Sequence, residues 1–305
     1  MQRYILIRAV WAIVALWAVS ILVFGLARIT GDPTNTLLSF EATDEQREIM
    51  KAYWGLDRPL PEQYAVFMGN IFQGDLGDSF KWRQPVTDLV KDRFPNTIML
   101  AVLAIAVASV IAIPMGVLSA VKRDSIFDSI GKSIALIGQS APPFWVGLVL
   151  MWIFAVQLDL VPTSGKSGVT SFILPTLALG LFWVAALMRL IRSAMLDVLD
   201  SEYVKLARIK GLAEWRVIWK HVLRNAAIAP LTYFAITLGS LMVGSVSIET
   251  VFQWPGLGFL LFNAARASDY ALLQGIMLTF TTIYIIANLL VDIAYAYLDP
   301  RIRYT

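Results

Sequence analysis

The chain has 305 residues, of which 58% are hydrophobic and only 15% charged, and its mean hydropathy is +0.67. A soluble domain has about a quarter of its residues charged, so this composition excludes an ordinary soluble enzyme or binding module and indicates a polytopic membrane protein. The absence of cysteine excludes disulfides, a thiolate nucleophile and cysteine metal sites. The formal net charge is only +3, so the positions of the basic residues carry more information than their sum.

Six intervals of at least 18 residues contain no Asp, Glu, Lys or Arg, and each is long enough to cross a hydrocarbon core of ~30 Å as a helix. They are residues 9–27, 94–121, 133–158, 167–188, 225–248 and 270–291. We therefore predict an all-α polytopic membrane protein with six transmembrane helices. In this division residues 1–29 hold the first helix, 30–94 an extracytoplasmic subdomain, 95–298 the other five helices and 299–305 a cytosolic tail.

The basic residues favour an orientation with both termini in the cytosol. With this orientation, fifteen of the 25 Lys and Arg residues lie in cytosolic segments, and the two short outer loops hold only Lys166 and Arg266. The other eight lie in or beside one long outer segment, which the positive-inside rule discounts. Arg3 and Arg8 precede the first helix and no small-residue cleavage site follows it, so we interpret it as an uncleaved span.

Residues 30–94 are polar and contain Gly, Pro and Trp, including the stretches Thr30–Pro33, Gly55–Tyr64 and Gly74–Ser79. About sixty-five residues are too many for a plain connector, so we expect a small subdomain on the outer side. Two interpretations of it stay open. It is either a lid of packed loops or a surface that docks a partner or guides a solute.

Proline and polar side chains fall inside the second, third and sixth intervals. Such groups turn toward the bundle interior or a cavity, because a polar group that faces lipid has no hydrogen-bond partner. They form a set of candidates for a translocation pathway: Asn96, Gln139, Ser140, Pro142 and Asn288. Helix packing, and a structural kink at Pro142 and Pro143, are the competing interpretation.

The sequence contains little that indicates catalysis or nucleotide binding. The Gly-Lys-Ser stretches at 131–133 and 165–167 lack the earlier glycine of a phosphate-binding loop, and neither follows a strand. His221 is the only histidine and has no Cys or acidic partner at metal-ligand spacing. Asp292, one turn after Asn288, lies near the end of the last interval, where a structural pairing with the basic tail competes with a functional role. We expect no catalytic, metal-binding or cofactor-binding residue in this chain.

Residues 200–230 are the only long stretch outside the first third of the chain that is polar, basic and still periodic. Asp200 or Ser201 can cap a helix that has Glu202 in its first turn and stops at Gly211, an order that complements the helix dipole. An apolar stripe at intervals of three and four residues continues into a second amphipathic helix: Leu206, Ile209, Leu212, Trp219 and Val222. The pattern predicts two helices with a glycine break at the cytosolic membrane surface, where a partner can reach them.

The stretch Tyr203–Pro230 resembles the cytosolic loop of the permease subunits of binding-protein-dependent ABC importers, specifically the peptide and nickel permease group. Gly55–Tyr64, Gly74–Ser79, Glu249–Gly258 and Asn288–Tyr304 also agree with that group and occur in the same order. The resemblance therefore covers nearly the whole chain.

The loop departs from the general importer pattern of Glu-Ala-Ala, a later glycine, and then Ile-x-Leu-Pro. Lys205, Leu206, His221 and Arg224 stand in place of the glutamate, the first alanine, the isoleucine and the proline. These departures resemble the peptide subgroup. As a result, either no residue of the loop takes over the role of the pattern's glutamate, or Glu202 does.

The resemblance implies a type I ABC importer permease in a bacterial inner membrane. Its partners would be a homologous second permease, two ABC ATPase subunits that bind ATP and Mg, an extracytoplasmic solute-binding protein that meets residues 30–94, and membrane lipid, but no nucleic acid. Within a coupling loop at 195–224, a coupling helix at 201–211 would sit in a cleft of an ATPase subunit. Its interface would consist of Glu202, Tyr203, Lys205, Ala207, Arg208, Lys210 and Gly211.

The imported solute is left open by these motifs. Di- and oligopeptides are the first expectation, and a nickel complex or another small solute of the same family is the alternative. An ion-driven secondary transporter is a more distant alternative, because no internal repeat is visible and the carboxylates lie near span ends. An intramembrane enzyme is a still more distant alternative, because no catalytic pair is available at membrane depth.

Overall fold

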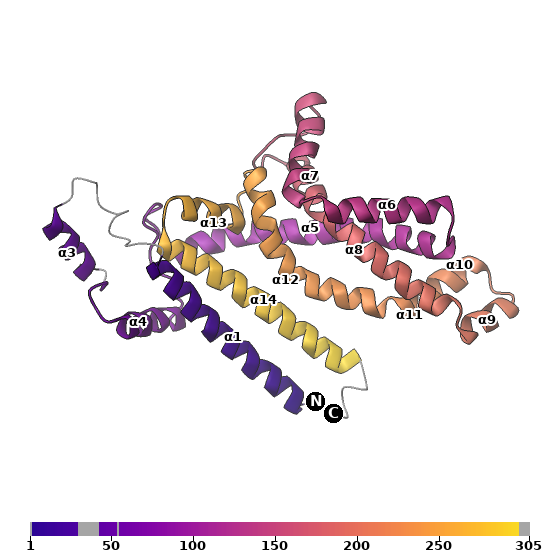
Figure 1. The fold of residues 1–305 in the computed structure, drawn as a ribbon, viewed down its shortest axis with the longest axis horizontal. Helices are drawn as coiled ribbons and strands as arrows, with labels where there is room; N and C mark the ends of the chain where they lie inside the picture. Colours follow the sequence, from indigo (N-terminus) through magenta and orange to yellow (C-terminus); the bar gives the residue numbers. More distant parts are fainter. Residues whose placement is uncertain (1, 30–42, 54, 299–305) are drawn as a thin grey trace. The chain divides into compact units, whose positions relative to one another are not determined.

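A computed structural model describes residues 2–29, 43–53 and 55–298 of the chain (Figure 1). The chain divides into two compact units, which are residues 1–97 with 255–305 (unit 1) and residues 98–254 (unit 2). The described residues are almost entirely helical, with one isolated bridge between Asp78 and Pro85 and no strand. The predicted tail at 299–305 and the first part of the predicted subdomain, 30–42, lie outside the described residues.

Unit 1 is formed by helices from both ends of the chain: α1 (Gln2–Ile29), α3 (Asp44–Tyr53), α4 (Leu60–Phe72), the start of α5 (Val86–Val121), α13 (Leu257–Arg266) and α14 (Tyr270–Leu298). α1 and α14 lie side by side (Figure 1), and the Gln274 side-chain amide donates to the Val23 carbonyl at 3.5 Å. The Phe24 ring packs against Tyr64 and Phe67 of α4, with centroids 5.4 and 5.5 Å away. The first and last long helices of the chain therefore form one packed layer with α4.

The loop at residues 73–85 is fixed to the start of α14 by the buried carboxylate of Asp269. The Ser79 hydroxyl donates to Asp269 Oδ2 at 2.6 Å and the Lys81 backbone N–H donates to the same oxygen at 3.1 Å. The Leu272 N–H donates to Oδ1 at 3.2 Å, which satisfies one of the unpaired amides at the beginning of α14. α5 already begins at Val86, so residues 86–94 of the predicted subdomain belong to a long helix.

Unit 2 contains the rest of α5, α6 (Ile126–Ser140), α7 (Pro143–Leu150), the π-helical η1 (Met151–Gln157), the 3-10 turn η2 (Val169–Phe172), α8 (Ile173–Leu199), α9 (Glu202–Ile209), α10 (Glu214–Arg216), the π-helical η3 (Val217–Val222), α11 (Leu223–Ala226) and α12 (Ile228–Val251). α8 is its central helix, since it packs against α6, α7 and α12. Ten or more of its side chains are buried, in keeping with a helix that has neighbours on several sides.

Each of the six charge-free intervals falls on helix. Four single helices in the described residues are long and apolar enough to cross a membrane: Ile5–Arg28, Val86–Val121, Val169–Leu199 and Tyr270–Leu290. The interval 225–248 lies on α11 and α12. The all-α polytopic fold is thereby confirmed.

The interval 133–158 is interrupted at Pro142 and Pro143, where the sequence allowed for a structural kink. It runs over α6 and then over α7 with η1, and the chain bends by 104° between these two segments, which is the geometry of a broken span or of a re-entrant loop. Pro142 has φ −60° and ψ 136° and precedes Pro143, the first residue of α7. Proline lacks an N–H and pushes the residue before it out of the helical region, so the two prolines end α6.

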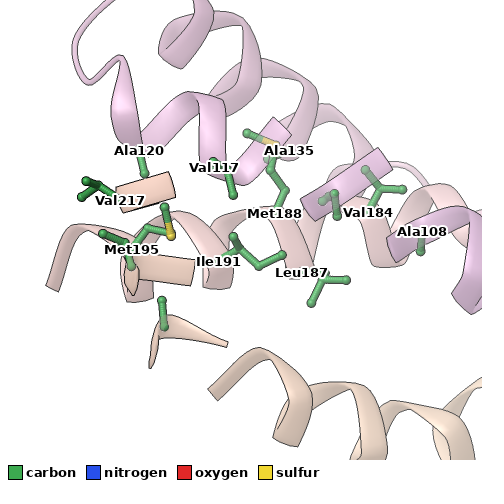
Figure 2. Packing of buried hydrophobic residues seen from close by; sticks show 14 of the residues in the cluster. Ala108, Val117, Ala120, Ala135, Val184, Leu187, Met188, Ile191, Met195 and Val217 are labelled. Atoms are coloured by element: carbon green, nitrogen blue, oxygen red, sulfur yellow. The ribbon is translucent and has the colours of Figure 1, made fainter. Parts of the chain in front are cut away.

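α8 is held against α5 and α6 by one apolar cluster. Figure 2 shows Met188 and Ile191 of α8 pointing toward Val117 of α5 and Ala135 of α6. Glycines permit this close approach: a Cβ at Gly116 would lie 2.9 Å from Ile191 Cβ. Protein interiors of this density tolerate added atoms poorly, so these helices are closely fitted.

Candidate functional site

The predicted pair of helices at residues 200–230 is present in unit 2. α8 ends at Leu199, α9 covers Glu202–Ile209, and a second helical run follows Gly211 through α10, η3 and α11. α9 packs on η3, and η3 packs on α8. The glycine break between two helices is therefore confirmed.

Ser201 occupies the N-cap position of α9, with an extended backbone at φ −69° and ψ 149°. The predicted side-chain cap is wrong, however, because the Ser201 hydroxyl donates to the Val198 carbonyl at 2.6 Å. The side chain is thus bonded to the last turn of α8. It links the end of α8 to the beginning of α9 across a single turn.

Gly211 ends α9 in the left-handed region, at φ +75°. The Gly211 N–H donates to the Arg208 carbonyl at 2.9 Å and the Leu212 N–H donates to the Ala207 carbonyl at 3.3 Å, the two bonds of a Schellman motif. Glycine adopts this conformation without steric cost. Leu212 then packs against the apolar cluster, which fixes the direction in which the second helix starts.

The inner face of the helix pair consists of Val204, Ala207, Val217 and Val222, which are buried in the same cluster as α8. Figure 2 shows Val217 beside Ala120 and Met195. The predicted apolar stripe is therefore partly wrong, because Leu206, Ile209 and Trp219 face outward. Small and β-branched side chains allow α9 to approach the cluster closely, whereas the longer side chains take the other face.

Five large apolar side chains of the helix pair are exposed: Tyr203, Leu206, Ile209, Trp215 and Trp219. Ile209 is 81% exposed and Trp215 is 62% exposed. Exposed aromatic and large aliphatic side chains on neighbouring elements are typical of a surface that a partner covers. We call these five residues the α9 patch.

Two ion pairs frame the α9 patch. Lys205 Nζ lies 2.9 Å from Glu202 Oε1 within α9, and Arg208 Nη2 lies 2.8 Å from Glu214 Oε1 across the Gly211 turn. The hydrogen bond to Glu202 raises the pKa of Lys205, and the bond to Glu214 raises the pKa of Arg208. Both basic groups stay charged at physiological pH, and the second pair braces α9 against α10.

Of the predicted coupling residues, Glu202, Tyr203, Lys205, Arg208, Lys210 and Gly211 are exposed. Ala207 is only 7% exposed and belongs to the inner face. Sequence reasoning missed Leu206, Ile209 and Trp215 as surface residues. The available signal was that α9 has apolar residues on two faces, only one of which this chain can cover.

The predicted pathway residues fall into both units. In unit 2, Gln139 is half-buried, Ser140 donates its hydroxyl to the Leu136 carbonyl at 2.8 Å, and Pro142 caps α7, so these three cluster at the bend. In unit 1, the half-buried Asn96 donates its amide to the Pro255 carbonyl at 2.7 Å, which ties α5 to the turn before α13. Asn288 is half-buried on α14, and the Asp292 side chain lies outside the described residues.

The residues that could have suggested nucleotide or metal binding take part in helix packing or in backbone hydrogen bonds. Gly131 lies inside α6 and faces the Met188 methyl group, and the Gly165 N–H donates to the Phe252 carbonyl at 2.8 Å. His221 lies half-buried on η3. Within the described ranges no three His, Cys, Asp or Glu residues lie close enough to hold a metal ion.

Comparison with known families gives matches over nearly the full length. Residues 112–304 match the family "Binding-protein-dependent transport system inner membrane component". Residues 1–101 match the N-terminal domain of the membrane components of the same transport systems.

Curated relatives align over the whole chain. A glutathione transport system permease protein GsiC of Pectobacterium atrosepticum is 40% identical, and a protein of Brucella suis biovar 1 named as a peptide permease is 38% identical, each over 100% of both chains. GsiC of Escherichia coli K12 is 37% identical over the same share. A solved structure of an amino acid ABC transporter with histidines matches 70% of this chain and 95% of its own, with a TM-score of 0.54 and 15% identity, which speaks for the fold alone.

Proposed function

Because the chain belongs to the family of inner-membrane components of binding-protein-dependent transport systems, and is the permease of an ABC importer, we propose that α9 and its patch couple it to separate ATPase subunits. The observation that carries the proposal is the two-sided construction of α9. Its inner face is fixed to this chain by Val204 and Ala207, while its outer face exposes Leu206 and Ile209. A helix built in this way can pass a movement of its partner into α8 as a rigid body.

The partners follow from this role. The membrane permease of an ABC system works with an ATPase and other components. In our proposal these are two ATPase subunits that bind ATP and Mg, a homologous second permease with which this chain shares the pathway, and an extracytoplasmic binding protein. This chain itself carries out no catalysis, both of its termini lie in the cytosol, and residues 30–94 face the binding protein.

A peptide or a peptide-like compound such as glutathione is the solute that we propose. The names of the full-length relatives from Brucella, Pectobacterium and Escherichia support this class. The bend at Gln139, Ser140 and Pro142 is the section of unit 2 that we assign to the pathway, because it offers hydrogen-bonding groups where a bent span interrupts the regular helix. Asn96 and Asn288 of unit 1 are separate candidates for contact with the solute.

The coupling role can be tested in the reconstituted importer with Ile209→Asp. We expect loss of ATPase co-purification and of ATP-dependent uptake, because a carboxylate in a covered apolar patch has to be desolvated without a partner. Leu160→Asp is the matched control, since Leu160 is 65% exposed, lies between η1 and η2 outside the helix pair, and is in none of the candidate spans. Normal ATPase association and uptake in Ile209→Asp would sink the coupling proposal.

The solute class can be tested in proteoliposomes that contain the complete importer and its binding protein. Uptake of a labelled dipeptide or of glutathione, competed by unlabelled peptide and dependent on ATP, is the expected result. Competition by a nickel complex but not by peptide would overturn the peptide assignment and leave the importer assignment standing. Uptake by this chain alone under an ion gradient would overturn both.

A further inference from the structure

Asp128, in the first turn of α6, has a fully buried carboxylate that is bonded from several directions. Arg192 of α8 binds it with both prongs, Nε to Oδ1 at 2.7 Å and Nη2 to Oδ2 at 2.9 Å. The Ser119 hydroxyl of α5 donates to Oδ1 at 2.5 Å, and the Asp124 N–H donates to Oδ2 at 3.1 Å. Lys132 Nζ, one turn later on α6, lies 2.8 Å from Oδ2. One carboxylate thus connects three helices of unit 2.

The network is specific in geometry. A two-pronged arginine–carboxylate pair fixes direction as well as distance, which a cluster of aliphatic side chains does not. Arg192 is 19% exposed and Asp128 is 0% exposed, so water competes little for either group. If stability alone were needed here, a well-packed apolar pair would serve as well, because burying two charges costs about as much as their attraction returns.

The position of Arg192 relates the network to the helix pair. Arg192 lies on α8 about two turns before the helix ends at Leu199, and its neighbours Ile191 and Met195 are buried with Val204 and Val217 of the helix pair (Figure 2). At the other side of the network, α6 leads to the bend at Ser140–Pro143. The ion pair therefore lies between the proposed place of energy input and the bent span.

We propose that the Asp128–Arg192 pair is a positioning clamp that makes α6 and the end of α8 move as one body with α9, so that movement at the ATPase interface reaches the bent span. The inference rests on the proposed coupling function. Neither residue touches the solute. Each acts by holding α6 at a fixed orientation on α8.

The first test measures solute imported per ATP hydrolysed in the reconstituted importer. Arg192→Lys keeps the charge and loses the two-pronged geometry. Asp128→Asn with Arg192→Gln removes both charges of the pair, so that only the half-exposed Lys132 ammonium loses its carboxylate partner. For both we expect ATPase association and basal hydrolysis to persist while the transport ratio falls by about tenfold, within the range of residues that carry coupling between sites. Arg123→Gln is the control, because Arg123 is 65% exposed and pairs with the exposed Asp124 carboxylate rather than with Asp128, and we expect at most a twofold change there, about the effect of an exposed ion pair.

The second test measures whether α6 and α8 move together. The chain has no cysteine, so spin labels at Leu136→Cys on α6 and Asp197→Cys on α8, both exposed, report on this pair of helices alone. We expect the same narrow distance distribution without nucleotide and with trapped ATP, and a broadened one in Arg192→Lys.

Two outcomes overturn the clamp. One is an unchanged transport ratio in both variants, and the other is a distance between the labels in the unaltered clamp that changes between the two nucleotide states. If the variants fail to assemble, the distance between the two labels in the importer with unaltered Asp128 and Arg192 still tests the clamp. These outcomes differ from a failure of the coupling proposal itself. That failure would show as normal ATPase association in the Ile209→Asp variant.

Discussion

Gly180 of α8 lies directly against the backbone of Ala104 on α5, since a Cβ added at Gly180 would come within 3.0 Å of the Ala104 carbonyl oxygen. Backbone cannot swing away as a flexible side chain does, so Gly180→Ala forces α8 and α5 apart. We expect the free energy of unfolding to fall by about 1–3 kcal/mol, the usual cost of overpacking. Thermal unfolding of the solubilised chain measures the effect.

Gly244→Ala is the matched control for this prediction, because Gly244 lies on α12 and a Cβ there would meet nothing within 4 Å. There the added methyl group should leave stability unchanged or raise it by up to ~1 kcal/mol, since alanine favours a helix more than glycine does. Equal effects of the two substitutions would contradict the close approach of α8 to α5.

Gly211 gives a prediction of a different physical kind. A Cβ at Gly211 meets no atom within 4 Å, but the backbone has φ +75°, where a side chain costs roughly 1–2 kcal/mol. We expect Gly211→Ala to destabilise the turn by about that amount and to weaken ATPase association, and Gly211→Asn to do so less, because asparagine tolerates this conformation. Hydrogen exchange of the Gly211 and Leu212 amides and co-purification of the ATPase measure the two effects.

Gly25→Ala is the control for Gly211, because Gly25 lies within α1 and a Cβ there also meets nothing within 4 Å. If Gly211→Ala exchanged no faster than the unaltered protein, the strained turn would not be what sets the direction of the second helix. If alanine and asparagine behaved alike, the conformational explanation would be wrong.

Much of the fold could be predicted from charge alone, because a charge inside the bilayer is costly and leaves a long readable gap where a span lies. The stop at Gly211 was equally readable, since few residues other than glycine adopt a positive φ. The interval 133–158 shows the limit of counting charges. The bend at Pro142 and Pro143 involves no charged residue, so the charge count alone does not reveal it.

The inner and outer faces of α9 could not be told apart in the same way. Leu206 and Ile209 fit an apolar stripe as well as Val204 and Ala207 do, and only the neighbouring helices decide which set is covered. Asp128 illustrates a second limit. In sequence it stands in a charged segment that looks like a solvated turn, and its partner Arg192 is distant along the chain, so no local pattern indicates that it is buried.

The conformation of the loop at 73–85 should be sensitive to Asp269, the residue before α14 that holds the loop. Asp269→Ala removes the acceptor of the Ser79 hydroxyl and of the Lys81 and Leu272 amides in a site that is 1% exposed. We expect a loss of about 2–3 kcal/mol, because buried donors are left unpaired. Faster proteolysis of the loop and a lower Tm measure it. Asp78→Ala, at an exposed residue next to Ser79, should change neither, and a similar effect of both would contradict the role of Asp269 as the anchor.

The bend between α6 and α7 should survive the loss of Pro142 but not the loss of both prolines. With Pro142→Ala, Pro143 still keeps the preceding residue out of the helical region. With both replaced, the local sequence no longer ends the helix at residues 141–143, and only the packing of α6 and α7 on α8 opposes their fusion. Spin labels at Leu136→Cys and Trp152→Cys, both exposed, should report an unchanged distance in the single variant. In the double variant the distance should lengthen toward the value for an unbroken helix, at ~1.5 Å per residue.

Uptake by the reconstituted importer should depend on whether the bend between α6 and α7 is kept. It should persist in Pro142→Ala and fall in the double variant, because in a straight helix Gln139 and Ser140 no longer lie at an interruption. Pro114→Ala is the control, since Pro114 lies inside α5, which runs on as one helix from Val86 to Val121 despite it. A proline inside a helix removes one hydrogen bond, and α5 continues through Pro114 despite that loss. A straightened α6–α7 with normal uptake would separate the bend from transport, and the pathway assignment of Gln139, Ser140 and Pro142 would then be wrong.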